Sequence, residues 1–146
     1  MLLSMENKQK EILSVGITIN QSLDLVWDTW VDENHMKYWM MISSDYEVKD
    51  AKNDLRIGGG YSYKMCSKIG DIQFDYAGTY IDIELKRLLV FTMNDNRRVE
   101  VQFSVIEDVV HVEFHFEAVS EQDFDVQVLG WQAMLVFFKK HVESLI

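Results

Sequence analysis

Hydrophobic and polar residues alternate over three stretches of this 146-residue chain, at residues 11–20, 99–105 and 110–117. In each stretch, nearly every second residue is apolar and most of the residues between are polar or small. A period of two residues predicts strands that bury one face and expose the other to water. Each of the three stretches is therefore expected to be a strand with one wet face.

The same approach predicts four more extended segments, at residues 46–49, 61–66, 72–84 and 88–93. Gly58-Gly59-Gly60 permits a tight turn before the second of them, and Asp95-Asn96 stands where a hairpin turn would follow the last. With the alternating stretches, these segments make about seven strands in antiparallel succession.

Three segments show a helical period instead. Ser22 is a suitable N-cap for a first short helix, and Asp32 is a second start signal for another that reaches Trp39. From Ser120, taken as an N-cap, apolar residues recur at three- and four-residue steps to Leu145. This last helix would be roughly 35–40 Å long, enough to cross a whole sheet.

The order of elements is strand, two short helices, about six strands and a long C-terminal helix, which predicts an α+β fold. A curved antiparallel sheet that grips the long helix would bury the apolar faces of both. Because no repeat or linker interrupts the chain, we expect one domain over residues 11–146, preceded by a flexible extension over residues 1–10.

Composition narrows the possible partners. Lys and Arg number 14 against 24 Asp and Glu, and the net charge of −10 opposes binding to nucleic acid or to an anionic membrane surface. No apolar run approaches the ~20 residues of a spanning helix, and the first residues do not resemble a signal peptide. Cys66 is the only cysteine, so no intramolecular disulfide is possible. We therefore expect a soluble, cytoplasmic monomer or homodimer.

The histidines do not indicate a metal site. On a strand, His111 and His115 share a face but lie roughly 13 Å apart, too far to share one zinc ion. His35 and His141 fall on predicted helices without further ligands at suitable spacing, and we interpret them as surface residues. No metal and no cofactor is expected.

No catalytic constellation is visible either. Cys66 should face outward, the Gly58–Gly60 run lacks the ending of a phosphate-binding loop, and no Gly-x-Ser-x-Gly elbow occurs. The strand period puts Asp75 on the face opposite Phe74 and Tyr76, away from any pocket that they line. Gln132 either presents its amide to a ligand or is exposed on the helix flank, and the sequence leaves both readings open. An enzyme is thus the third interpretation, with no catalytic residues predicted.

Four motifs, in order and spacing, resemble the activator of heat-shock-protein-90 ATPase homologue-like family. They are Val26-Trp27 with Trp39, the run Asp54–Gly59, the segment Gly78–Ile83 followed by Arg87-Leu88 and Phe91-Thr92, and Gly130-Trp131. The resemblance covers about residues 12–145. It implies the START and birch-pollen-allergen-like helix-grip fold (SRPBCC), in which a seven-stranded sheet wraps around the C-terminal helix. It also implies a cavity between sheet and helix, where members of the superfamily bind lipids, sterols, polyketides or plant hormones; others only regulate partners.

Aromatic residues dominate the faces that would enclose this cavity, as is typical of sites for small molecules. The expected ligand-binding residues are Trp30, Trp39, Tyr61, Tyr63, Met65, Phe74, Tyr76, Phe91, Phe103, Phe114, Trp131, Leu135 and Phe138. The alternative is that these side chains simply fill the core. Methionines, among them Met36, Met40, Met41 and Met134, would suit an adaptable pocket but are also ordinary core filler.

Two functions follow from these observations. The first hypothesis is a cytoplasmic protein that binds a small hydrophobic molecule. The alternative is a protein-interaction, co-chaperone or stress-response module without an evolved ligand, whose binding surface would be exposed aromatics among Trp27, Trp30, Tyr38 and Trp39. A simpler interpretation of those aromatics is that they anchor the short helices onto the sheet.

Overall fold

Seven strands form one antiparallel sheet in the order β1-β7-β6-β5-β4-β3-β2. The computed structural model describes residues 11–145, so the extension expected over residues 1–10 lies outside the described part. In chain order the elements are β1 (Ile12–Ile19), α2 (Leu23–Val31), α3 (Glu33–Met36), β2 (Tyr46–Asn53), β3 (Gly60–Ser67), β4 (Gln73–Glu84), β5 (Leu88–Met93), β6 (Arg98–Ile106), β7 (Val109–Glu117) and α4 (Phe124–Glu143). The predicted α+β helix-grip architecture is confirmed.

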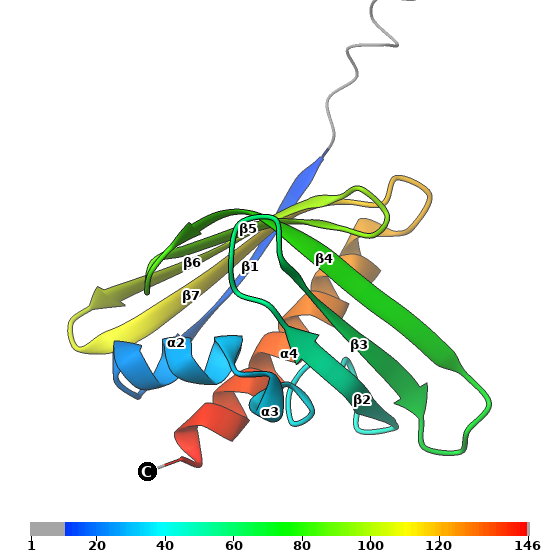
Figure 1. Ribbon diagram of the computed structural model, residues 1–146, viewed down its shortest axis with the longest axis horizontal. Helices are drawn as coiled ribbons and strands as arrows, with labels where there is room; N and C mark the ends of the chain where they lie inside the picture. Colours follow the sequence, from blue (N-terminus) through cyan, green and yellow to red (C-terminus); the bar gives the residue numbers. More distant parts are fainter. Residues whose placement is uncertain (1–10, 146) are drawn as a thin grey trace, which may run out of the picture.

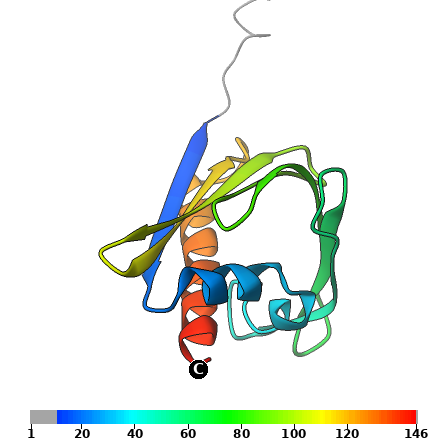
Figure 2. The same cartoon turned by 60° about the vertical axis from the view of Figure 1, so that its left-hand side comes forward.

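The sheet is strongly curved and α4 lies along its concave side (Figure 1). Strands β2 to β7 form a meander in which each strand pairs with the next, and β1 closes the edge by pairing with β7. In the rotated view of Figure 2, α2 and α3 lie across the open end, between the β1 edge and the β2–β3 edge. The helices thus cover the concave face from which side chains of the central strands project.

The two short helices begin where the capping signals predict. Ser22 Oγ accepts a hydrogen bond from the Leu25 N–H at 3.2 Å, and Asp32 Oδ1 accepts one from the Asn34 N–H at 2.8 Å. These caps satisfy N–H groups that have no partner inside the helix. The second helix is shorter than expected, because regular α-helix ends at Met36 and turns continue to Trp39.

Two boundaries differ from the prediction. Strand β2 continues to Asn53 because a bulge between Lys49 and Lys52, with Asp50 at a φ of 54°, interrupts the alternation without ending the strand. Helix α4 begins only at Phe124, since the side chain of Asp123, not of Ser120, caps it by accepting from the Asp125 N–H at 2.8 Å. With 20 residues, α4 is about 30 Å long, shorter than expected.

Side chains of α4 protect the exposed edge of β1. Gln132 Nε2 donates to Gly16 O at 3.1 Å, and Lys139 Nζ donates to Thr18 O at 2.6 Å. One turn further on, the Asn20 N–H donates to the Glu143 carboxylate at 2.8 Å, and this contact lowers the pKa of Glu143. An edge strand otherwise offers such groups to another chain. Gln132 is therefore engaged with the sheet, which resolves the two readings of its amide.

The tryptophans of the short helices are core residues. Trp27, Trp30 and Trp39 are only 2%, 7% and 0% exposed, which confirms that they anchor α2, α3 and the turns after it to the rest of the fold. Only Tyr38, 52% exposed, remains available on the surface. The surface hypothesized from these four aromatics is therefore absent.

A histidine pair joins α3 to α4. His35 Nδ1 lies 2.8 Å from His141 Nε2, and Tyr38 stacks on the His141 ring with centroids 4.8 Å apart. The two histidines, interpreted from the sequence as surface residues, are half-buried and lie side by side, because the packing of α3 on α4 brings together residues 106 positions apart. One ring must donate and the other accept, so this contact needs at least one neutral imidazole.

The histidine pair predicts a loss of stability in mild acid. Burial, followed by the nearby His35, lowers the pKa of His141 from its ordinary value of 6.5. The stabilisation is therefore complete above about pH 6.5 and is lost as the pH falls through the folded-state pKa, because the unfolded chain binds the proton more readily. Calorimetry between about pH 7.5 and pH 5 should show a smaller fall in Tm for His141→Gln than for the wild type. His111→Gln is the control for the loss of one imidazole, and equal slopes for His141→Gln and wild type would contradict the prediction.

Candidate ligand-binding site

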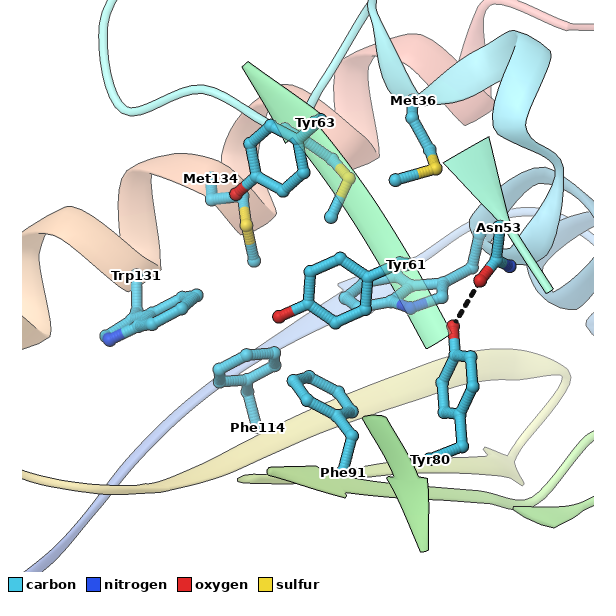
Figure 3. Close-up of a pocket in the computed structure, with 11 residues that line it drawn as sticks. Met36, Asn53, Tyr61, Tyr63, Tyr80, Phe91, Phe114, Trp131 and Met134 are labelled. Carbon is cyan, nitrogen blue, oxygen red and sulfur yellow. Dashed lines mark hydrogen bonds between the residues drawn. The ribbon is translucent and has the colours of Figure 1, made fainter. Parts of the chain in front are cut away.

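A small cavity of about 20 Å³ lies between the concave face of the sheet, the segment from α2 to Met40, and α4 (Figure 3). This is about the room for a single water molecule. Its lining is mainly aromatic and sulfur-containing and consists of Trp30, Met36, Met40, Asn53, Tyr61, Tyr63, Tyr80, Phe91, Phe114, Trp131 and Met134.

Strand register determines where the two central tyrosines lie. Tyr61 is opposite Gly78 on β4, and Tyr63 is opposite Tyr76. A Cβ atom added at Gly78 would lie 2.5 Å from Cε1 of Tyr61, so the Tyr61 ring occupies the space that a side chain would need. The absence of a side chain at Gly78 therefore lets the Tyr61 ring lie over β4, inside the cavity.

The hydroxyls of Tyr61 and Tyr63 are unusual for an apolar interior. Each residue is 8% exposed, and neither hydroxyl has a hydrogen-bond partner among the described residues. In Figure 3 the Tyr61 hydroxyl points toward Trp131 and that of Tyr63 toward Met134. Burial raises the pKa of both groups well above the ordinary value, so both stay neutral and keep a proton to donate.

At the opposite end of the cavity, the polar groups are satisfied. Tyr80 donates its hydroxyl proton to Asn53 Oδ1 at 2.7 Å, and Asn53 Nδ2 donates to Val31 O at 2.7 Å. Burial raises the pKa of Tyr80 to about 12, partly offset by this hydrogen bond. These bonds tie β2 and β4 to the end of α2, so this end of the cavity is rigid.

An open groove of about 230 Å³ adjoins the cavity and shares Met40, Tyr63, Trp131 and Met134 with it. Its further lining comes from the loop after α3, the β3–β4 pair, the β5–β6 turn and the first half of α4: Met41, Ile42, Met65, Tyr76, Arg97, Gln122, Val126, Gln127 and Gly130. The groove is therefore rich in methionine, is open to solvent and adjoins the cavity.

The residues expected at the site fall into three groups. Trp30, Tyr61, Tyr63, Phe91, Phe114 and Trp131 line the cavity. Met65 and Tyr76 line the groove. Trp39, Phe103, Leu135 and Phe138 are packed in the core at 0–2% exposure, and Phe74 is 42% exposed. Phe74 lies near the start of β4, and its ring contacts Tyr46 and Tyr76 instead of lining the cavity.

The sequence expectation omitted Tyr80, Asn53 and Arg97. The sequence could have placed Tyr80 at the cavity, because alternation from Phe74 and Tyr76 along β4 puts it on the same face. The pattern could not have placed Asn53 there, since this residue follows the bulge in β2. Arg97 follows the β5–β6 turn, where the strand period gives no direction.

The described residues contain no group of three or more His, Cys, Asp or Glu side chains that could hold a metal ion. His115 instead bonds Ser14 and Glu113 on the convex face, at 2.8 and 3.2 Å. Asp75 is exposed. No helix among residues 11–145 is both long and apolar enough to cross a membrane.

Comparison with known proteins agrees with this fold. Residues 20–143 match the family model described as Activator of Hsp90 ATPase homolog 1-like protein. The solution structure of the AHSA1-like protein from Aeromonas hydrophila is 33% identical with a TM-score of 0.83, over 90% of this chain and 93% of that one. A solution structure from Cytophaga hutchinsonii is 30% identical with a TM-score of 0.78, over 90% and 91% of the two chains.

More distant structures share the fold alone. A crystal structure from Nitrosomonas europaea is 13% identical with a TM-score of 0.79, and covers 91% of this chain and 94% of its own. No match was found among the curated proteins.

The position of the Tyr61 ring predicts a cost for a single methyl group at Gly78. Gly78→Ala would force the ring away from β4, and overpacking of this kind costs about 1–3 kcal/mol. We expect the free energy of unfolding in urea to fall by this amount, and the aromatic NMR signals of Tyr61 to shift.

For Gly130 we expect the opposite effect, a gain in stability on substitution by alanine. It lies inside α4, and the heavy atom nearest to an added Cβ is Ile42 Cγ2 at 3.9 Å, an ordinary contact. Since glycine in a helix interior costs about 0.5–1 kcal/mol relative to alanine, Gly130→Ala should raise Tm by about 1–4 °C. A fall in Tm for this variant would show that the glycine is needed for packing rather than for open space in the groove.

Proposed function

This chain belongs to the family of Activator of Hsp90 ATPase homolog 1-like proteins, and on that basis we propose that it is a cytoplasmic protein that binds a small, mainly apolar molecule between its sheet and α4. The observation that carries the proposal is the pair of partnerless hydroxyls, Tyr61 and Tyr63, at the wall of an aromatic cavity. Cys66, the only cysteine, supports a reducing compartment.

The position of the two hydroxyls argues against these tyrosines as simple core filler. Among the described residues only Trp39 Nε1 is both fully buried and without a hydrogen-bond partner, so the Tyr61 and Tyr63 hydroxyls border accessible space, where phenylalanine would form the same aromatic wall without a polar group. A ligand with a hydrogen-bond acceptor would satisfy one or both hydroxyls while its apolar part replaces the open space beside Trp131 and Phe114. The tyrosines therefore suit binding better than stability.

Size indicates how such a ligand would enter. The cavity alone is far below the roughly 300–1,000 Å³ of typical ligand pockets, and the groove approaches the lower end of that range. Met40 and Met134 line both spaces, and methionine has three rotatable side-chain bonds. Rotation of these two side chains would join the groove to the cavity and bring the ligand to Tyr61.

A second candidate function, protein–protein interaction in a co-chaperone or stress response, is favoured by apolar residues on the solvent side of α4. Leu129 is 68% exposed and Val136 is 39% exposed. Neither lines the cavity or the groove. A partner surface here would therefore be separate from the small-molecule site, and substitutions at these positions would leave ligand binding intact.

The binding proposal is tested with naphthalene-1-acetamide, a neutral aromatic probe that carries a hydrogen-bond acceptor. We expect saturable binding in tryptophan fluorescence, with shifted amide NMR signals at Met65 and Met134. Gly130→Trp places a large side chain in the groove and should weaken binding by about tenfold or more, because the probe and the indole compete for one space. Tyr61→Phe with Tyr63→Phe should weaken it by about two- to tenfold per lost hydrogen bond.

Leu129→Trp is the matched control for Gly130→Trp. It adds an indole to the neighbouring residue of α4, whose side chain is exposed to solvent. This control should bind the probe like the wild type. Absence of binding to the wild type, or equal weakening by both tryptophan variants, would overturn the proposal.

A further inference from the structure

From the groove we infer that the ligand is an amphipathic carboxylate, with its apolar body between Met65 and α4 and its carboxylate on the guanidinium of Arg97. This inference rests on the proposed function, because it concerns the same groove and assigns the chemical class of its occupant.

Arg97 is the only charged residue in the lining of the groove. Its side chain is 17% exposed, less than that of any other Lys or Arg in an ion pair of the described residues. In a chain with a net charge of −10, this places a cation beside the apolar side chains of the groove. Asp95 already pairs with this charge, so the case for an anionic occupant rests on the guanidinium N–H groups that Asp95 leaves free.

Asp95 orients this guanidinium but uses only one of its hydrogen-bond donors. Its Oδ2 accepts from Arg97 Nε at 2.8 Å, and its Oδ1 accepts from the Arg97 backbone N–H at 3.2 Å. A guanidinium has five N–H donors, and Asp95 takes one of them. The terminal nitrogens have no further partner among the described residues, so a two-pronged donor remains for a ligand.

The positive charge acts on the interior of the site as well. Burial is the main effect on Tyr61 and Tyr76 and raises the pKa of both; Arg97 lowers both pKa values, and its ion-pair partner Asp95 raises them. Arg97 is therefore close enough to act electrostatically on the aromatic wall, and an anion at its terminal nitrogens would lie beside that wall.

A carboxylate matches these donors. Planar guanidinium and carboxylate groups form two parallel charge-assisted hydrogen bonds, which are about twice as strong as neutral ones. The buried side-chain amide of Gln127 also lines the groove, but it is not available to a ligand. It already forms hydrogen bonds with the backbone of Val119 and Gln122 at 2.8–3.3 Å. Arg97 is thus the head-group contact, and Met65, Trp131 and Met134 contact the apolar body.

The test compares naphthalene-1-acetate with naphthalene-1-acetamide, which share one apolar body and differ in charge. The wild type should bind the acetate about tenfold or more tightly than the amide. Arg97→Gln should abolish this preference, and Arg97→Lys, which keeps the charge but loses the fork, should retain part of it. Unfolding curves of both variants check that the fold persists.

Arg98→Gln is the matched control, because it changes the net charge equally at the next residue. Arg98 pairs with Glu100 at 3.1 Å and lies outside the groove lining. Its preference for the acetate should equal that of the wild type, and an equal loss in Arg98→Gln would overturn the inference by showing a long-range effect of charge.

The remaining outcomes separate this inference from the proposed function. If the wild type binds both probes equally and Gly130→Trp still blocks both, the apolar site stands and the carboxylate inference fails. If the wild type binds neither probe, both the proposed function and the inference fail.

Discussion

The rest of the structure depends on the packing of the Trp30 ring against four other aromatic rings. This ring lies 5.7 Å from Phe103 of β6, 6.4 Å from Phe114 of β7, 4.5 Å from Trp39 and 4.9 Å from Phe138 of α4, all measured between ring centroids. Sheet, short helices and α4 therefore meet at one side chain. Aromatic pairs of this geometry stabilise beyond the area that they bury. Since Trp30 also lines the cavity, the size of the site is coupled to the packing of the fold.

The two halves of helix α4 differ in what they contact. In its second half, Leu135, Phe138 and Val142 are completely buried, and Lys139 and Glu143 bond the edge of β1. The first half, by contrast, lines the groove and contains a glycine whose missing side chain leaves the groove open. Before Met134, only Gln127 of α4 is buried, so this part of the helix packs less on the core than the part from Met134 onward.

The architecture was predictable because the hydrophobic pattern specifies it directly. Strict alternation in β6 and β7, the caps at Ser22 and Asp32 and the long C-terminal period each correspond to an observed element. Where the pattern is interrupted, prediction was incomplete: the bulge at Asp50 hid the second half of β2, and Ser120 was taken for the cap of α4 that Asp123 forms. Pairing across the fold, as between His35 and His141, depends on how helices pack and leaves no periodic signal.

The site was less predictable than the fold for a physical reason. Periodicity says which face a residue occupies, but a cavity exists only where opposing faces fail to meet, so Phe103 and Phe138 fill the core while Tyr61 and Tyr63 border open space. The residues that distinguish binding from packing are those that break local rules. Hydroxyls without partners, Gly78 beneath an aromatic ring and Arg97 in an apolar groove each carry a local cost that the surrounding fold must offset. Their grouping in the cavity and the adjoining groove is the observation behind the proposal that this protein binds a ligand.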